Sequence, residues 1–241
     1  MNSSSTTPPA LLPQADTPEP DVMAPIRGLG GTIEALLRRP QGVLHHLHEP
    51  GAARIIGVMF VLVLFGAAAY GFVVGTFSGG TQLWAAPLKV ALGLLLCSVI
   101  CLPSLYVFAC LTGATARFGD VAGMVMGMAA LMVLLLISFA PVAWVFSQST
   151  ESITAMGTLH LVFWLIATYF GARFLYRGMS RLGARGEGAF YFWICLFVVV
   201  ALQMTTALRP IVGSADTFLP AEKKFFLQHW REHVDGPVAT R

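Results

Sequence analysis

Five long apolar stretches limit what this chain can fold into. They lie at residues 55–76, 88–111, 121–146, 159–176 and 190–208, and Ile153 and Met156 could extend the fourth, which is the shortest. A helix that crosses the hydrocarbon core of a bilayer needs about 20 mostly apolar residues, because each residue advances the helix by about 1.5 Å. None of the stretches alternates apolar and polar residues in the manner of a β-barrel strand. The sequence therefore predicts an all-α, polytopic integral membrane protein with a bundle of five transmembrane helices.

The composition supports this fold class and excludes several functions. The chain is 56% hydrophobic and only 11% charged, whereas soluble domains carry about 25% charged residues. A soluble enzyme would lack the polar groups to cover its surface, and a disordered protein would be far less apolar. The net charge of +3 is too small to favour a nucleic-acid partner. We expect the partners to be the lipid bilayer and other membrane protein subunits.

The five-helix domain, residues 55–210, is flanked by three segments of different character. Residues 1–31 form a predicted disordered cytoplasmic tail, because their beginning is rich in Ser, Thr and Pro and contains no apolar signal segment. Residues 32–54 form an amphipathic segment, and residues 211–241 form a carboxyl-terminal tail with one amphipathic helix. The first apolar stretch is too long for a signal peptide, so we expect it to remain as a membrane anchor.

The amphipathic segment has two interpretations. Apolar residues recur at helical spacing before and after Pro40, at Ile33, Leu36, Leu37, Val43, Leu44 and Leu47. The pattern predicts two short helices lying on the inner membrane surface. A structured linker packed against the loops fits it equally well. His45, His46 and His48 on the polar face are residue types that bind metals, but we expect a pH-sensitive surface patch or no specific role.

The positions of Lys and Arg predict the orientation, because basic residues favour the cytoplasmic side. With a cytoplasmic amino end, nine basic residues fall inside and six fall outside. The inside set is Arg27, Arg38, Arg39, Arg54, Arg117, Arg173, Arg177, Arg181 and Arg185. The outside set is Lys89, Arg209, Lys223, Lys224, Arg231 and Arg241. The sequence therefore predicts a cytoplasmic amino end and an external carboxyl end.

Basic residues at the helix ends are the candidate contacts with lipid or a partner. Arg173, Arg177 and Arg181 follow one another at intervals of four residues at the inner end of the fourth span. This row could bind anionic lipid headgroups or a phosphate-bearing ligand, or it could simply fix the topology. Arg209, directly before Pro210, is expected at the outer interface or against a partner carboxylate.

Trp230 shares one face of the predicted carboxyl-terminal helix with Phe226, Leu227 and Val234. We expect this helix to lie on the outer membrane surface or on a partner subunit. His229 and His233 beside it match the His-x-x-Glu-His pattern of one zinc-protease class. Because the further ligand and the substrate cleft of that class are missing, we expect a solvated helix face and no metal.

Small residues and prolines mark where helices can approach or bend. Gly71 and Gly75, and likewise Gly123 and Gly127, lie one helical turn apart and predict close helix packing. Pro103 and Pro141 lie inside the second and third spans and predict kinks, which serve packing or shape a cavity.

Polar residues inside the spans are few. Lys89 is placed where it can reach the outer interface, and Gln203 is placed to hydrogen-bond across helices. Cys97, Cys101, Cys110 and Cys195 all fall inside spans, where we expect reduced packing residues and no cofactor. No Asp or Glu lies in the middle of a span. That argues against a proton-coupled transporter and an intramembrane aspartyl protease.

Two sets of short segments resemble known bacterial membrane proteins. LLRRPQGVLHHL before the spans and LPSLYVFACLTG at 102–113 resemble the bacterial Yip1-like five-helix family. FAPVAWVFSQST and LQMTTALRPIVG are similar to bacterial membrane proteins of the same size. The resemblance covers about residues 33–215 but lacks the Asp-Leu-Tyr-Gly-Pro motif of eukaryotic members. It implies five helices, a cytoplasmic amino end and residence in the bacterial inner membrane, and it supplies no catalytic residues.

Two functions fit these features. The first is a non-enzymatic scaffold or accessory subunit of a larger membrane complex, acting through helix and partner contacts. The second is a transporter or channel for a small solute or lipid, with Pro103, Pro141 and Gln203 around a cavity. We expect the first, because no group of residues has the pattern of a catalytic site.

Overall fold

The described part of the chain is a helical bundle. The computed structural model describes residues 25–207 except 50, 79, 81, 151 and 186. The helices in this part are α1 (Gly28–Arg38), α2 (Pro40–His46), α3 (Ala52–Ser78), α4 (Gln82–Leu111), α5 (Phe118–Ser149), α6 (Ile153–Arg181) and α7 (Glu187–Ala207). No β-strand occurs among these residues. The all-α fold class predicted from the sequence is confirmed.

The five helices α3 to α7 are each long and apolar enough to cross a membrane, and each contains one of the five predicted spans. Helix α4 begins six residues earlier than predicted, at Gln82, and α6 begins at Ile153, to which the sequence allowed the fourth span to extend. At α6 the Ser152 side chain accepts a hydrogen bond from the backbone N–H of Ala155 and so caps the helix start. A capping hydrogen bond of this kind determines where a helix begins. The hydropathy of the sequence does not show it. The protein is a multi-pass membrane protein.

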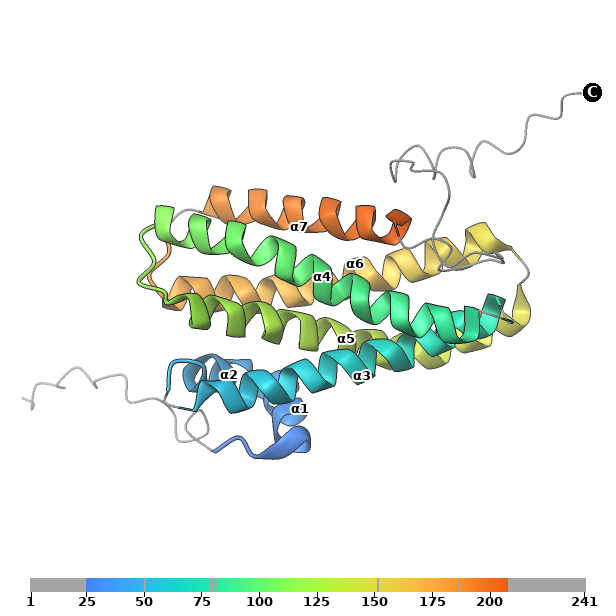
Figure 1. Cartoon of the computed structure of the whole chain (residues 1–241), viewed down its shortest axis with the longest axis horizontal. Coiled ribbons are helices and arrows are strands. Elements are labelled where there is room, and N and C mark those ends of the chain that lie inside the picture. Colours follow the sequence, from blue (N-terminus) through green and yellow to red (C-terminus); the bar gives the residue numbers. More distant parts are fainter. Residues whose placement is uncertain are drawn as a thin grey trace, which may run out of the picture.

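The long helices lie side by side along the long axis of the molecule (Figure 1). α5 packs against α3, α4 and α6, while α3 also packs against α4, and α7 packs mainly against α4. The most apolar part of α5 is 67% buried, compared with 17% for that of α7. The core therefore surrounds α5, and the other long helices leave much of their apolar surface for lipid or a partner.

The short helices α1 and α2 lie beside the end of the bundle where α3 begins (Figure 1). Leu36, Val43, Leu44 and Leu47 are all buried, with at most 3% of their surface exposed. Helix α1 packs against α3 and α5, and α2 packs against α6. The sequence left open whether the apolar faces of these two helices lie on the membrane surface or against the protein. In the structure they pack against helices of the bundle. We call helices α1 and α2 together the cap.

Several glycines lie where a larger residue would collide with a neighbouring helix. A Cβ atom on Gly71 would lie 2.6 Å from Cα of Pro87. The absence of a side chain at Gly71 therefore allows α3 to pack closely against α4. A Cβ atom on Gly127 would lie 2.7 Å from Cε1 of Phe174 on α6. On Gly123 a Cβ atom would lie 2.7 Å from Cδ2 of Leu47, next to the cap. Gly75 is buried on α3.

Prolines are accommodated inside two of the long helices. Pro103 lies within α4, where Pro87 also falls, and Pro141 lies within α5. Both helices continue through these positions as α-helices. Lys89 is only 1% exposed, so its side chain is enclosed by the protein and does not extend to the outer interface, contrary to the expectation from the sequence. The kinks remain a prediction.

Candidate functional site: the arginine end of the bundle

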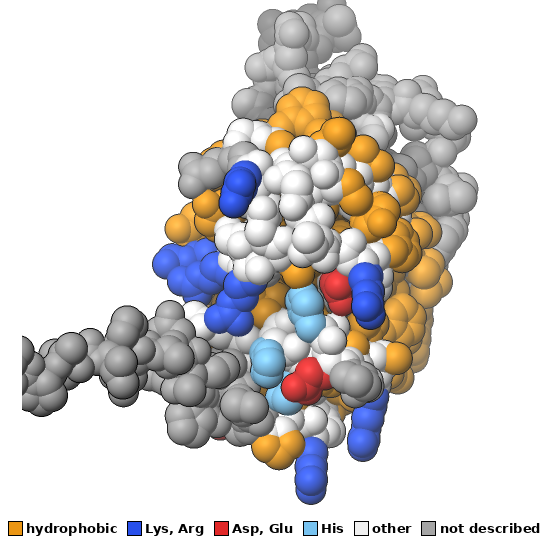
Figure 2. All heavy atoms as spheres, turned by 90° about the vertical axis from the view of Figure 1, so that its left-hand side faces the viewer, with side chains coloured by type: hydrophobic (Ala, Val, Ile, Leu, Met, Phe, Trp, Pro, Cys, Tyr) orange, Lys and Arg blue, Asp and Glu red, His pale blue; other side chains and the backbone are white. Residues whose placement is uncertain are grey.

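Nine arginines gather at the end of the bundle that carries the cap, which we call the arginine end. They lie on the cap, at the starts of α3 and α5, at the end of α6 and in the loop after α6. They are Arg27, Arg38, Arg39, Arg54, Arg117, Arg173, Arg177, Arg181 and Arg185. In Figure 2, which views this end, blue side chains lie around its rim, next to the orange apolar sides of the bundle. The surface combines cations with an adjoining lipid-compatible wall.

Three of these arginines belong to the row predicted from the sequence. Arg173, Arg177 and Arg181 are exposed along one side of α6. The opposite side of the same helix segment is buried, at Phe174, Leu175, Gly178 and Met179. The row is thus held in place by a packed helix face, and its guanidinium groups point away from the core.

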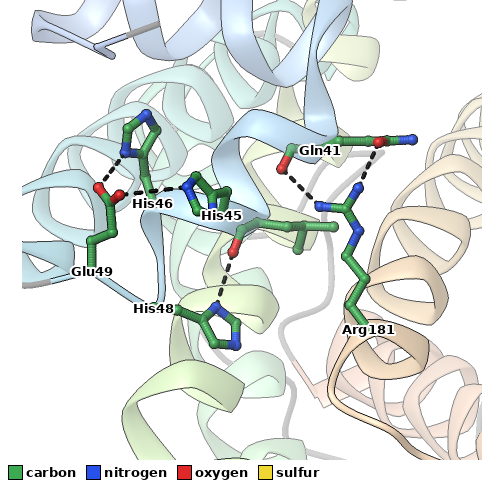
Figure 3. A network of polar contacts seen from close by, with 7 residues as sticks. Gln41, His45, His46, His48, Glu49 and Arg181 are labelled. Atoms are coloured by element: carbon green, nitrogen blue, oxygen red, sulfur yellow. Dashed lines mark hydrogen bonds and ion pairs between the residues drawn. The ribbon is translucent and has the colours of Figure 1, made fainter. Parts of the chain in front are cut away.

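Arg181 also links α6 to the cap. Its Nη1 donates a hydrogen bond to the backbone oxygen of Gln41 at 3.1 Å, and its Nη2 donates to Gln41 Oε1 at 2.5 Å. Figure 3 shows this pair of bonds between α6 and α2. The two acceptors belong to a neutral residue, so the positive charge of Arg181 is oriented by the cap but is not neutralised there.

The loop after α4 and the loop after α6 meet next to Arg181. Together they line a pocket of about 400 Å³ that is open to the surface. The backbone N–H of Thr115 donates to the Leu182 oxygen at 3.0 Å, and that of Arg185 donates to the Thr112 oxygen at 2.9 Å. The pocket is lined by Thr112, Gly113, Thr115, Arg181, Leu182, Gly183 and Arg185. Because it lies where α4 and α6 end, the negative ends of two helix dipoles partly offset its arginines.

The histidines of the cap form a polar cluster with Glu49 (Figure 3). His46 Nδ1 lies 2.8 Å from Glu49 Oε2, and His45 Nε2 lies 3.5 Å from Glu49 Oε1. His48 instead contacts the Leu44 oxygen through its Nδ1 at 3.0 Å. The hydrogen bond from His46, aided by the positive charge of His46 and His45 when protonated, lowers the pKa of the Glu49 carboxyl below its ordinary value of 4.5. Within the described residues, no group of three or more His, Cys, Asp or Glu side chains could hold a metal ion.

Aromatic side chains make two polar contacts between described helices in the bundle interior, and the sequence did not single out either contact. Tyr70 Oη of α3 lies 2.7 Å from His160 Nδ1 of α6. Trp193 Nε1 of α7 donates to the Cys101 oxygen at 3.2 Å and to Ser104 Oγ at 3.1 Å. The only sequence signal for either contact was a polar ring atom in an apolar span, and one chain does not reveal its partner.

The remaining predicted site residues are not brought together. Gln203 is half-buried near the end of α7 that lies opposite the arginine end. Arg209 and Trp230, and with them His229, His233 and the predicted carboxyl-terminal helix, lie outside the described residues. The link from Gln41 to Arg181 was missed, because the spacing of residues along one helix does not show which loop or cap residue folds against it.

No family model, no curated protein and no solved structure matches the chain. The class of protein therefore follows from the fold alone, which is that of a multi-pass helical membrane protein.

Proposed function

We propose that the protein is a non-enzymatic scaffold or accessory subunit of a larger membrane complex in the bacterial inner membrane. In this proposal it acts through helix and partner contacts, with its arginine end in the cytoplasm. The resemblance to bacterial Yip1-like proteins agrees with five helices and with this orientation. The excess of basic residues at one end supports the orientation independently.

One observation carries the proposal: the space around α5 is used for packing. Gly66, Gly123, Gly127, Gly171 and Gly178 lie on α5 or against it, and an added Cβ atom on each would come within 3.0 Å of a neighbouring segment. Contacts this close leave little room for a passage between the helices concerned. Chemistry or transport would need a polar interior space, whereas a scaffold needs only a rigid body and an outer surface.

Three serines within the spans support the same proposal. Ser98, Ser104 and Ser138 each donate their hydroxyl hydrogen bond to a carbonyl of their own helix. Such bonds satisfy a polar group in lipid without building a site. The pocket at the arginine end lies at the opposite end of α7 from Gln203, so it is not the cavity that the transport alternative requires.

Site-specific photo-crosslinking in the native host tests the proposal. A photoreactive amino acid replaces an exposed aromatic residue on three different helices, Phe65 of α3, Trp144 of α5 and Tyr191 of α7. We expect at least one position to give a single discrete adduct with another membrane protein. The same adduct should form when the partner is tagged and purified instead. Buried Met128 is the matched control and should give none.

A protein that forms no adduct at any exposed position, and that migrates as a lone monomer after extraction in mild detergent, would contradict the proposal. Uptake of a solute by vesicles containing only this protein would favour the transport alternative.

A further inference from the structure

We propose that Arg173 and Arg177, with Arg181 beside them, form a binding site for the phosphate group of an anionic phospholipid in the leaflet on the arginine side. This inference requires only that the bundle spans a membrane, and it does not rest on the scaffold role.

The first argument is the depth of the row. Residues 153–172 of α6 contain no Asp, Glu, Lys or Arg, and 20 helical residues span about 30 Å, which is the thickness of the hydrocarbon core. Arg173 directly follows this stretch. Arg173 and Arg181 are eight residues apart, so the row extends about 12 Å along the helix. It therefore crosses the headgroup layer, where lipid phosphates lie.

The second argument is the side of the helix on which the row lies. Leu165, Ile166, Tyr169 and Phe170 precede the row on the exposed side of α6. Tyr169 and Phe170 are 61% and 45% exposed and lie within about one turn of Arg173. An apolar surface of a spanning helix that no other helix covers is available to lipid chains. A lipid whose acyl chains lie against this surface would place its headgroup at Arg173 and Arg177.

The third argument is the lack of a counter-charge within the described part of the protein. Arg173 and Arg177 make no ion pair with any described residue. Three carboxylates at this end are engaged elsewhere: Glu34 pairs with Arg38, Glu49 contacts His46, and Asp120 accepts the backbone N–H of Arg117. An anion from outside the protein can therefore bind these two guanidinium groups without displacing an existing partner.

The helix dipole does not account for the row. Cations stabilise a helix C-terminus only within about the last turn. Arg181 is the last residue of α6, but Arg173 lies two turns earlier. If these residues only fixed the orientation of the protein in the membrane, lysine would serve as well as arginine. A phosphate site instead favours arginine, because a planar guanidinium can donate two parallel hydrogen bonds to phosphate oxygens.

The test is lipid binding by the full-length protein, measured by native mass spectrometry as phospholipid is added in detergent. The probes are dioleoyl phosphatidylglycerol and dioleoyl phosphatidylcholine. We expect wild type to bind phosphatidylglycerol at least about tenfold more tightly, since each cation near a charged surface contributes about 1 kcal/mol. The double variant Arg173→Gln/Arg177→Gln should lose this preference. The matched control Arg38→Gln/Arg54→Gln, which removes the same charge elsewhere on the arginine end, should keep it.

A second variant separates a phosphate site from a topology signal and guards against misfolding. Arg173→Lys/Arg177→Lys keeps both charges, so we expect normal membrane insertion with a preference reduced at least threefold. An unchanged preference in the glutamine variant, or an equal loss in the control, would overturn the proposal. Full competition by millimolar glycerol phosphate would also overturn it, because the site would then bind a free phosphate ester and not a lipid.

Discussion

At the residue scale, Trp193 shows how a polar atom is accommodated in the apolar interior. Its side chain is fully buried on α7, and its indole N–H donates to the Cys101 oxygen and to Ser104 Oγ of α4. A buried donor that lost both acceptors would have no water to replace them. The two bonds therefore connect α7 to α4, the helix against which α7 mainly packs.

Replacing Trp193 with Phe tests this contact. The variant keeps an aromatic ring but removes the donor, so the free energy of unfolding should fall by about 0.5–1.5 kcal/mol, with a further loss from the smaller ring. Titration with sodium dodecyl sulfate in mixed micelles measures the free energy of unfolding of the variant and of wild type. Trp144→Phe is the matched control, because Trp144 is 52% exposed on α5. Equal effects of the two substitutions would contradict the assigned role.

Glu49 gives the cap a dependence on pH. Because the His46 hydrogen bond lowers the pKa of Glu49 in the folded state, the carboxylate stabilises the fold above its ordinary value of 4.5, and this contribution disappears as pH falls through the lowered pKa. Glu49→Gln should therefore lower the melting temperature at pH 7 and have a smaller effect at pH 3. Melting curves followed by intrinsic fluorescence measure both. A difference that stays constant between the two pH values would exclude this contribution.

At the element scale, the approach of α3 to α4 depends on Gly71. The atoms that a Cβ at this position would meet are backbone atoms, Cα of Pro87 and the Ala86 oxygen at 2.9 Å, which cannot rotate away. Helices in lipid associate largely through such close packing, because lipid chains are as apolar as the side chains that the helices would bury. A methyl group here must push the two helices apart.

Gly71→Ala should therefore lower the free energy of unfolding by about 1–3 kcal/mol. Gly57→Ala on the same helix is the matched control, because nothing lies within 4 Å of its added Cβ. That substitution should stabilise the protein by about 0.5–1 kcal/mol, since alanine favours a helix over glycine. The free energy of unfolding of both variants can be measured in mixed micelles. If the two substitutions change it in the same direction, the close packing of α3 against α4 at Gly71 is contradicted.

The docking of the cap can be tested with two adjacent leucines of α1. Leu36 is 1% exposed, whereas Leu37 is 53% exposed. Leu36→Ala should weaken the packing by about 2–5 kcal/mol, and trypsin should then cleave faster after Arg38. Leu37→Ala should leave the cleavage rate close to that of wild type. Faster cleavage in the Leu37 variant alone would mean that α1 packs through its other face.

At the scale of the whole molecule, the sequence predicted the number and type of the long helices because about 20 apolar residues have few alternatives to a spanning helix. It left open whether the fourth span extends to Ile153, because the Ser152 cap that begins α6 is a local hydrogen bond and not a change in hydropathy. The row from Arg173 to Arg181 could be read from spacing within one helix. Its link to Gln41 could not, because that contact depends on where the cap folds.

The location of the arginine end in the cytoplasm is the central claim of the proposed function, whereas the lipid site requires only that the bundle spans a membrane. In a background with Cys110 and Cys195 replaced by alanine, a cysteine is introduced at Thr115, in the loop between α4 and α5, or at Ser152, before α6. A membrane-impermeant maleimide is then applied to intact expressing cells. We expect immediate labelling at position 152, and labelling at position 115 only after the membrane is permeabilised. Labelling of position 115 in intact cells, with position 152 protected, would show that the arginine end faces outward and would contradict the account.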